Sequence, residues 1–361
     1  MNPKPQSCLR KGQLVADILS CSWRESRIPP LEISAAELDE VTPLLYGSGA
    51  AALGWWRIRE TSLKASPSAV VLHQAYRLQA LQSAIHEEKI EKVFRLLSQA
   101  SVGAILVKGW AAAGLYPDAA LRPYGDIDLC VRPEHFKRAE DVFSTAEASD
   151  CWVDLHKHFS ELDERSIDEL FARSRLVKLG DEQIRILSAE DHLALLCIHL
   201  LKHGAWRPVW LCDVGAAIES LPPDFHWDLC LGRGRKRSSW IICVIGLAHR
   251  LLNANIGRLP VAKRTEQLPA WLVENVLKQW ATPFATSQPP MSHRAPMASY
   301  LRNPHGLLKD LRKRWPNPII ATISINGEFN DLPRLPYQLG NCVLRAGRFL
   351  FDLPARLQSE R

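Results

Sequence analysis

The sequence has no closely spaced pair of cysteines. Its nine cysteines are scattered, none belongs to a CxxC motif, and several lie inside apolar runs, such as Cys197 in LALLCIHLL. This pattern favours reduced, buried thiols of the kind found in cytosolic proteins.

Long hydrophobic segments are also missing. The longest apolar run, at residues 240–248, is too short to cross a bilayer. The first 13 residues contain no apolar core segment, so a signal peptide is not expected. We therefore expect a cytoplasmic protein without a membrane partner.

The excess of one charge is small. With 45 Lys and Arg against 39 Asp and Glu, the formal net charge is +6. This suits a protein that handles anions such as nucleotides, but it is too diffuse to indicate nucleic acid. A short basic run at 233–237 fits a solvated loop, with contact to an acceptor or to nucleic acid as the alternative.

Internal repeats and low-complexity tracts are absent from the 361 residues, of which 47% are apolar and 23% charged. These values indicate a soluble globular protein of two or three packed units. Residues 1–100 are predicted to be helical, with a capping box at Ser34–Glu37 and apolar residues at helical spacing over 68–100.

The pattern changes after Ser101. Short apolar or alternating segments predict strands at 102–107, 126–131 and 151–159, a helix from Pro133 to about Ala146, and a hairpin over 175–187. From Ser188 to residue 361 the pattern is helical again, with helices near 188–203, 207–220, 236–254, 269–280, 304–315 and 336–350 and a loop at 281–297. The expected fold is α+β: a small mixed sheet at 101–187 between helical regions at 1–100 and 188–361.

Two acids stand at alternate positions of one predicted strand. Asp126 and Asp128 should project from the same face, since side chains alternate along a strand. Adjacent carboxylates repel unless a cation lies between them, and Mg²⁺ uses one or two carboxylates plus substrate oxygens. Two such ions could serve a phosphoryl transfer.

A third acid is expected on a neighbouring strand. Asp154 lies between Val153 and Leu155 and should share a face with His156 and His158. A solvated strand edge would explain two acids in one strand equally well. The strand–Lys–Gly–helix pattern upstream and the apolar–Asp–apolar pattern downstream favour a metal site.

The junction at Lys108–Gly109 joins a predicted strand directly to a helix. Backbone N–H groups at such a turn attract phosphate, and Lys108 adds positive charge. A plain turn between strand and helix is the alternative.

In these motifs the chain resembles the polymerase-β-like nucleotidyltransferase superfamily, and within it an uncharacterised nucleotidyltransferase family. The resemblance rests on ILVKG (105–109), LYPDAALRPYGDIDLCV (115–131), VDLHKHF (153–159) and the block at 186–214, which resembles the family's helix with two histidines followed by an Asp-bearing helix. It covers about residues 70–250 well. The ordered set of motifs is much more specific than any one of them.

The resemblance implies a polymerase-β-like sheet topology and a metal-dependent transfer of a nucleoside monophosphate from a nucleoside triphosphate such as ATP, with release of pyrophosphate. Asp126 and Asp128 would be the paired ligands of Mg²⁺ or Mn²⁺, and Asp154 the third ligand, placed to activate the acceptor. Lys108, Gly109 and Trp110 would form the phosphate turn, although the superfamily usually has a Ser or Gly where this chain has Trp110.

Three cationic residues share one face of a predicted helix. His199, Lys202 and His203 are spaced i, i+3 and i+4, and they could receive the triphosphate. Structural histidines between helices are the alternative, and a zinc pair is disfavoured because no third ligand is evident. Arg122 lies four residues before Asp126 and could bind phosphate or form a structural ion pair.

The sequence therefore predicts a nucleotidyltransferase acting on an unidentified acceptor, namely a small molecule such as a natural product, a peptide or a protein. Two alternatives belong to other classes. One is a catalytically inactive nucleotide-binding or scaffold protein, against which the three intact acids argue. The other is a nucleic-acid-binding module, which is disfavoured because no such signature appears.

Overall fold

The computed structural model describes residues 5–26, 28–162, 164–283 and 314–358. The chain begins with helices, as predicted. They are α1 (Pro5–Leu19), α2 (Ala35–Gly47), α3 (Ala51–Ile58) and α4 (Pro67–Gln99). The predicted capping box is confirmed: the Ser34 hydroxyl accepts from the Glu37 N–H, and the Glu37 carboxylate accepts from the Ser34 N–H. Pro67 occupies the first position of α4, where no intrahelical donor is lost.

A five-stranded sheet follows. Its strands are β1 (Ala104–Val107), β2 (Ile127–Val131), β3 (Val153–His156), β4 (Arg175–Leu179) and β5 (Glu182–Ile186). Their order is β3-β2-β1-β5-β4. The pairs β1–β2 and β4–β5 are antiparallel, whereas β1–β5 and β2–β3 are parallel. The predicted α+β fold with a small mixed sheet is confirmed, as is the hairpin, whose turn contains Gly180 at φ +58°.

Short helices connect the strands. They are α5 (Gly109–Ala113) after β1, α6 (Phe136–Phe143) after β2 and α7 (Ile167–Arg173) after β3. The predicted helix at Pro133 starts as a short 3₁₀ turn that leads into α6. The three strands predicted before the hairpin are all shorter than expected. β1 begins at Ala104, β2 begins at Ile127, so that Asp126 precedes it, and β3 covers only Val153–His156.

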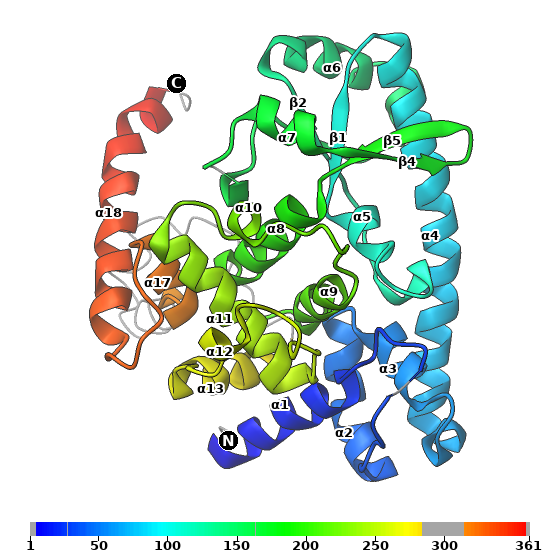
Figure 1. Ribbon diagram of the computed structural model, residues 1–361, viewed down its shortest axis with the longest axis vertical. Coiled ribbons are helices and arrows are strands. Elements are labelled where there is room, and N and C mark those ends of the chain that lie inside the picture. The colour runs from blue at the N-terminus through cyan, green and yellow to red at the C-terminus, as the bar shows by residue number, and fades with distance from the viewer. Residues whose placement is uncertain (1–4, 27, 163, 284–313, 359–361) are drawn as a thin grey trace.

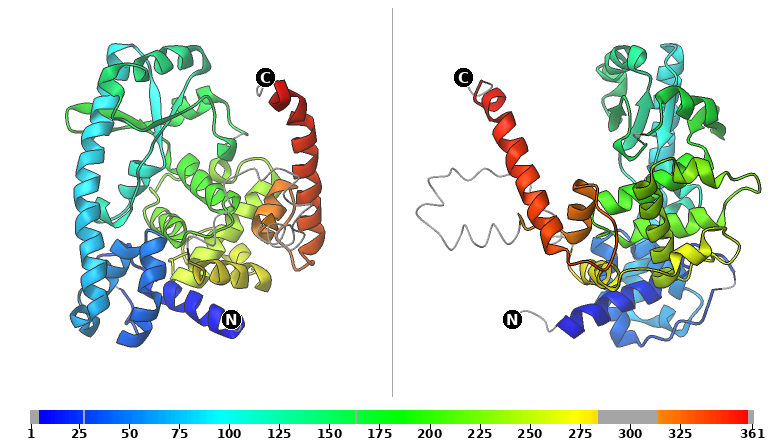
Figure 2. Two further views of the ribbon diagram at one scale, coloured as in Figure 1. Left: turned by 180° about the vertical axis from the view of Figure 1, so that it is seen from behind. Right: turned by 60° about the vertical axis from the view of Figure 1, so that its left-hand side comes forward.

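The remaining described chain is helical. Its helices are α8 (Ala189–Lys202), α9 (Pro208–Glu219), α10 (Trp227–Leu231), α11 (Arg235–Leu252), α12 (Ala262–Thr265), α13 (Ala270–Trp280), α17 (Pro318–Ser324) and α18 (Leu335–Gln358). The predicted loop at 281–297 and helix at 304–315 lie largely outside the described residues. Figures 1 and 2 show α4 along one side of the molecule, from the sheet to the N-terminal helices, and α18 on the opposite side. None of the helices in the described segments combines the length and apolar character needed to span a lipid bilayer.

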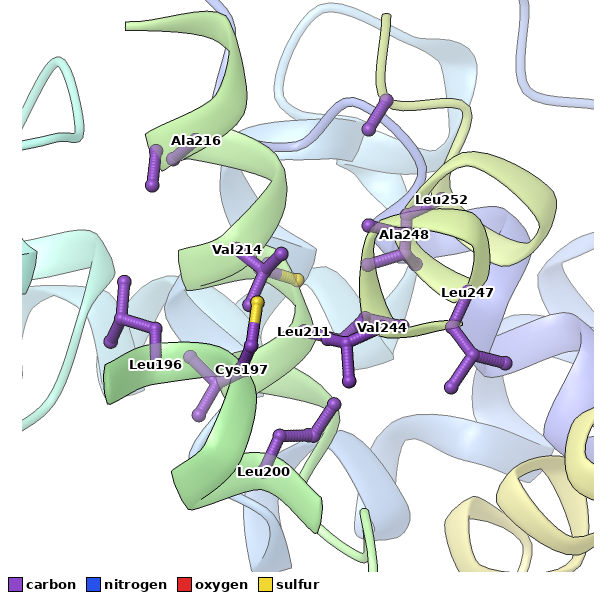
Figure 3. Packing of buried hydrophobic residues seen from close by; sticks show 14 of the residues in the cluster. Leu196, Cys197, Leu200, Leu211, Val214, Ala216, Val244, Leu247, Ala248 and Leu252 are labelled. Atoms are coloured by element: carbon purple, nitrogen blue, oxygen red, sulfur yellow. The ribbon is translucent and has the colours of Figure 1, made fainter. Parts of the chain in front are cut away.

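Two apolar cores lie on the two faces of the sheet. The larger one joins the first helices with α8, α9, α11 and α13, and it takes Ile105, Val107 and Cys130 from the sheet. The smaller one takes Leu106 and Leu129 from the alternate positions and packs them against α4 and α6. Figure 3 shows the larger core where α8, α9 and α11 meet, with Leu196, Cys197, Leu200, Leu211, Val214, Ala216, Val244, Leu247, Ala248 and Leu252 labelled. A side chain on the face of Cys130 therefore points toward the helical region.

Candidate functional site

Two of the predicted acids lie side by side on parallel strands. Asp128 on β2 is in register with Asp154 on β3. Ile127 and Leu129, on either side of Asp128 in the sequence, are buried in the smaller core on the opposite face. Asp128 is buried, whereas 60% of the Asp154 side chain is exposed. The two carboxylates thus share the face that looks toward α8 and α9, and Asp154 is open to solvent.

His156 follows on the same face of β3. Its Nε2 is 3.2 Å from an Asp154 carboxylate oxygen and 3.3 Å from one of Asp128. Ligand atoms of these three residues lie within 4.8 Å of one another, and no other such group of His, Cys, Asp or Glu occurs in the described part of the chain. Carboxylates suit Mg²⁺ and Mn²⁺, and imidazole is a ligand of divalent transition-metal ions such as Zn²⁺ and Fe²⁺. The three residues could therefore hold a divalent metal ion.

Lys108 approaches the acids from the end of β1. Its Nζ is 3.6 Å from Asp128 Oδ1 and 5.2 Å from the centre of the Phe159 ring. Burial by itself raises the pKa of Asp128, but the hydrogen bond from His156 and the charge of Lys108 outweigh it, so the pKa lies below its usual value. Asp128 is therefore ionised at neutral pH, as a metal ligand must be.

The turn after β1 has an unusual backbone. Lys108 has φ +61° and Gly109 has φ +36°. A positive φ is uncommon for a lysine, and such outliers concentrate at functional sites. This conformation aims the Lys108 side chain at Asp128, while Gly109 lies against the backbone of Asp126 and the Tyr124 side chain.

Asp126 does not share the close grouping of the other two acids. It precedes β2, is exposed, and is not among the residues whose ligand atoms lie within 4.8 Å. It nevertheless lines the same cleft as Asp128 and Asp154.

This cleft has a volume of about 650 Å³ and lies between the sheet, α4 and the helices α8 and α9. That size is within the usual range for small-molecule sites, about 300–1,000 Å³. The lining includes most of the site residues that the sequence predicts, together with several residues that the sequence did not indicate. The lining consists of Gln79, Gln82, His86, Lys108, Gly109, Arg122, Pro123, Tyr124, Gly125, Asp126, Asp128, Asp154, His156, His199, His203, Arg207 and Trp210.

The helical part of the lining contributes a cluster of rings from the end of α8 and from α9. The His199 ring lies 4.4 Å from that of His203 and 4.7 Å from that of Trp210, between centroids. His199 Nδ1 is 3.5 Å from a carboxylate oxygen of Glu161. Burial lowers the pKa of His199 despite that carboxylate, so its ring is neutral at neutral pH.

Two of the other predicted substrate-binding residues do not line the cleft. Lys202 donates from Nζ to the Ser160 hydroxyl at 2.7 Å, and neither residue is among those that line the cleft. The indole N–H of Trp110 donates to Glu87 on α4 at 3.1 Å. Both residues are therefore held by neighbours outside the cleft.

Arg122 lines the cleft but is engaged in a buried ion pair. Its Nη2 is 2.9 Å from a carboxylate oxygen of Asp213 on α9, and neither residue is appreciably exposed. The Tyr116 hydroxyl donates to the same carboxylate at 2.7 Å. Asp213 thus joins the loop before β2 to the helical region.

The sequence interpretation did not include His156 or Arg207 among the site residues. For His156 a signal existed, since it stands two positions after Asp154 in a strand. Arg207 offered none, because its contacts are with residues far away in the sequence, such as the Ser48 carbonyl.

Comparison with known proteins gives one match. A model of a family described as "Uncharacterised nucleotidyltransferase" matches residues 34–253, which include the sheet, the cleft and α8 to α11. No curated protein and no solved structure matches. Because the match covers more than half of the chain, this protein belongs to that nucleotidyltransferase family.

Proposed function

We propose that this protein transfers a nucleoside monophosphate from a nucleoside triphosphate to a hydroxyl or amine of an acceptor. The acceptor oxygen or nitrogen forms a bond to the α-phosphorus, the bond to the β-phosphate oxygen breaks, and pyrophosphate leaves. The acceptor proton passes to a base in the cleft or to water. The family membership and the grouping of Asp128, Asp154 and His156 support this proposal.

The donor set fits a divalent cation. Two carboxylates and one imidazole offer atoms within 4.8 Å of one another, and Asp128 is held in its ionised form. We propose that Asp128 and Asp154 hold Mg²⁺ or Mn²⁺, with Asp126 completing the set from the edge of the cleft. Such an ion offsets the charge of the phosphate oxygens and orients them.

The other cleft residues have separate proposed tasks. Asp154, the more exposed acid, is open to solvent and can accept the acceptor's proton. Lys108 and Gly109 are proposed to border the phosphates, and His199 and His203 to face them from the helices. Lys202, Arg122 and Trp110 would support these positions indirectly, through their contacts with Ser160, Asp213 and Glu87.

The observation that carries the proposal is the in-register pair of carboxylates, bridged by His156 and flanked by Lys108, in a cleft of nucleotide-compatible size. We propose a small molecule, a peptide or a protein as acceptor, and the cytoplasm as the location of the reaction. A triphosphate such as ATP would be the donor.

The test traces phosphorus. The purified protein is incubated with Mg²⁺, a cell extract and each triphosphate labelled at either the α- or the γ-phosphate. Compared with extract alone, the added protein should transfer label from the α-position to an acceptor and should add no transfer of label from the γ-position, which leaves with pyrophosphate. Additional transfer of γ-label would indicate a kinase, and binding without any additional transfer would favour the scaffold alternative.

A further inference from the structure

Arg207 contributes a guanidinium to the cleft from the residue that precedes α9. Its Nε donates to the Ser48 carbonyl at 2.9 Å. Its Nη2 packs on Gly49, where an added Cβ would lie only 2.5 Å away, and Gly49 itself has φ +77°. The rings of Trp206 and Trp210 lie 5.9 Å and 5.7 Å from its Cζ. The side chain is therefore held in place by backbone and rings.

Arg207 makes no direct ion pair with an acid among the described residues, whereas Arg122 in the same cleft has Asp213 at 2.9 Å. The charges of Asp213 and Asp126 act on the Arg207 guanidinium only from farther away. Burial, followed by the charge of Arg122, lowers the pKa of Arg207 to about 10. The guanidinium therefore stays protonated at neutral pH. Keeping this charge partly buried lowers the stability of the folded protein, and a bound anion would offset that loss.

The other cations of the cleft are already engaged or neutral. Lys108 lies beside Asp128, and the pKa of His199 is lowered. Among the described residues that line this cleft, Arg207 is therefore the charged cation that makes no direct ion pair. A guanidinium presents its N–H donors in one plane and can bond to two oxygens of a phosphate group at once, which no other cationic side chain does as well.

We infer that Arg207 binds the β- and γ-phosphates of the nucleoside triphosphate, and that it distinguishes a triphosphate from a monophosphate. This inference rests on the proposed function. Its geometric basis is the origin of the lining residues: Asp128 and Asp154 lie on the strands, where a metal and the α-phosphate would meet the acceptor. The guanidinium comes from the residue before α9, in the helical part of the lining, where the departing pyrophosphate would lie.

The experiment measures binding by titration calorimetry in the presence of Mg²⁺. The ligands are α,β-methylene analogues of the four ribonucleoside triphosphates, which cannot be transferred, and the corresponding monophosphates. Arg207→Gln should weaken triphosphate binding about tenfold to a hundredfold, as expected for a charge-assisted pair. Its affinity for the monophosphate should be unchanged. Arg207→Lys, which retains the charge without the planar set of donors, should fall between wild type and Arg207→Gln.

A matched control is Arg175→Gln, which removes the same charge from the exposed edge strand β4, at the other side of the sheet from β3. It should bind all ligands as the wild type does. A second measurement on the wild type avoids any effect of substitution on folding. The triphosphate analogue should protect Arg207 from modification by phenylglyoxal, mapped by mass spectrometry, and the monophosphate should not.

The outcomes separate the two claims. If the wild type binds no triphosphate, the proposed function itself is wrong. If it binds and Arg207→Gln binds equally well, or loses monophosphate affinity to the same extent, only this inference is overturned. A variant that keeps triphosphate affinity but loses transfer would place the guanidinium on the acceptor, which also overturns the inference.

Discussion

The two walls of the cleft carry opposite chemistry. On the strand wall, formed by Lys108, Asp128, Asp154 and His156, acids dominate and the nearby cations offset them only in part. On the helix wall, formed by His199, His203, Arg207 and Trp210, rings lie beside a guanidinium that makes no direct ion pair among the described residues. The strand wall is built to attract cations and the helix wall to attract anions. On the proposed function, a nucleotide bound with a metal ion would carry both kinds of charge, and each wall would take one of them.

The largest expected effect is on stability, and it follows from removing the ion pair that connects the two walls. Arg122 and Asp213 join them through a buried ion pair. Arg122→Gln leaves the Asp213 carboxylate buried with only the Tyr116 hydroxyl, and it should lower the free energy of unfolding by about 3–5 kcal/mol. Chemical denaturation measures this. Lys278→Gln, which breaks an exposed pair with Glu274, is the control and should change stability by less than about 1 kcal/mol. Equal effects of the two substitutions would show that Asp213 does not hold the walls together.

The next effect is catalytic and is confined to the strand wall. Asp128→Asn preserves the shape of the side chain but removes the charge that would hold the metal. Transfer of the α-labelled nucleotide should fall by about a hundredfold or more. Stability should fall slightly, since Lys108 and His156 lose their anionic partner. Near-normal transfer by this variant at saturating Mg²⁺ would show that Asp128 is not needed for the reaction.

A smaller effect concerns pH and the helix wall. The pKa of His199 is lower in the folded protein than in the unfolded chain, where it is near 6.5. The unfolded chain therefore binds a proton first, and stability falls as pH drops below about 6.5. His199→Gln should lose less stability between pH 7 and pH 5 than the wild type. His158→Gln, at an exposed position near the end of β3, should follow the wild-type curve. Identical curves for all three proteins would mean that His199 is not desolvated.

The smallest effect is expected at Lys202. Because its ammonium group bonds to Ser160 and does not line the cleft, Lys202→Ala should change triphosphate affinity by no more than about fivefold. A loss of triphosphate affinity as large as that of Arg207→Gln would show that Lys202 contacts the nucleotide and that α8 rearranges when the nucleotide binds.

Much of the strand wall could be predicted because a strand alternates its faces. That rule placed Asp128 opposite Leu129 and identified Asp154 on the neighbouring strand. It could not decide that β2 begins one residue after Asp126, since strand ends depend on pairing with the neighbouring strand.

The helix wall was harder to predict. The i, i+3, i+4 rule grouped Lys202 with His199 and His203, but the long lysine side chain turns to Ser160 instead. Arg207 could not be found at all, because its position depends on Ser48, 159 residues away. Contacts between distant helices are set by packing, and one sequence contains no local sign of them.

The most direct test of the proposal that the strand wall binds a metal ion is a measurement of Mn²⁺ binding. Electron paramagnetic resonance would monitor this binding in the presence of an α,β-methylene triphosphate analogue. The wild type should bind Mn²⁺ at the site, whereas Asp128→Asn and Asp154→Asn should each lose most of this binding while thermal melts show a folded protein. Mn²⁺ binding that is unchanged in both folded variants would contradict the assignment of these carboxylates as the metal ligands.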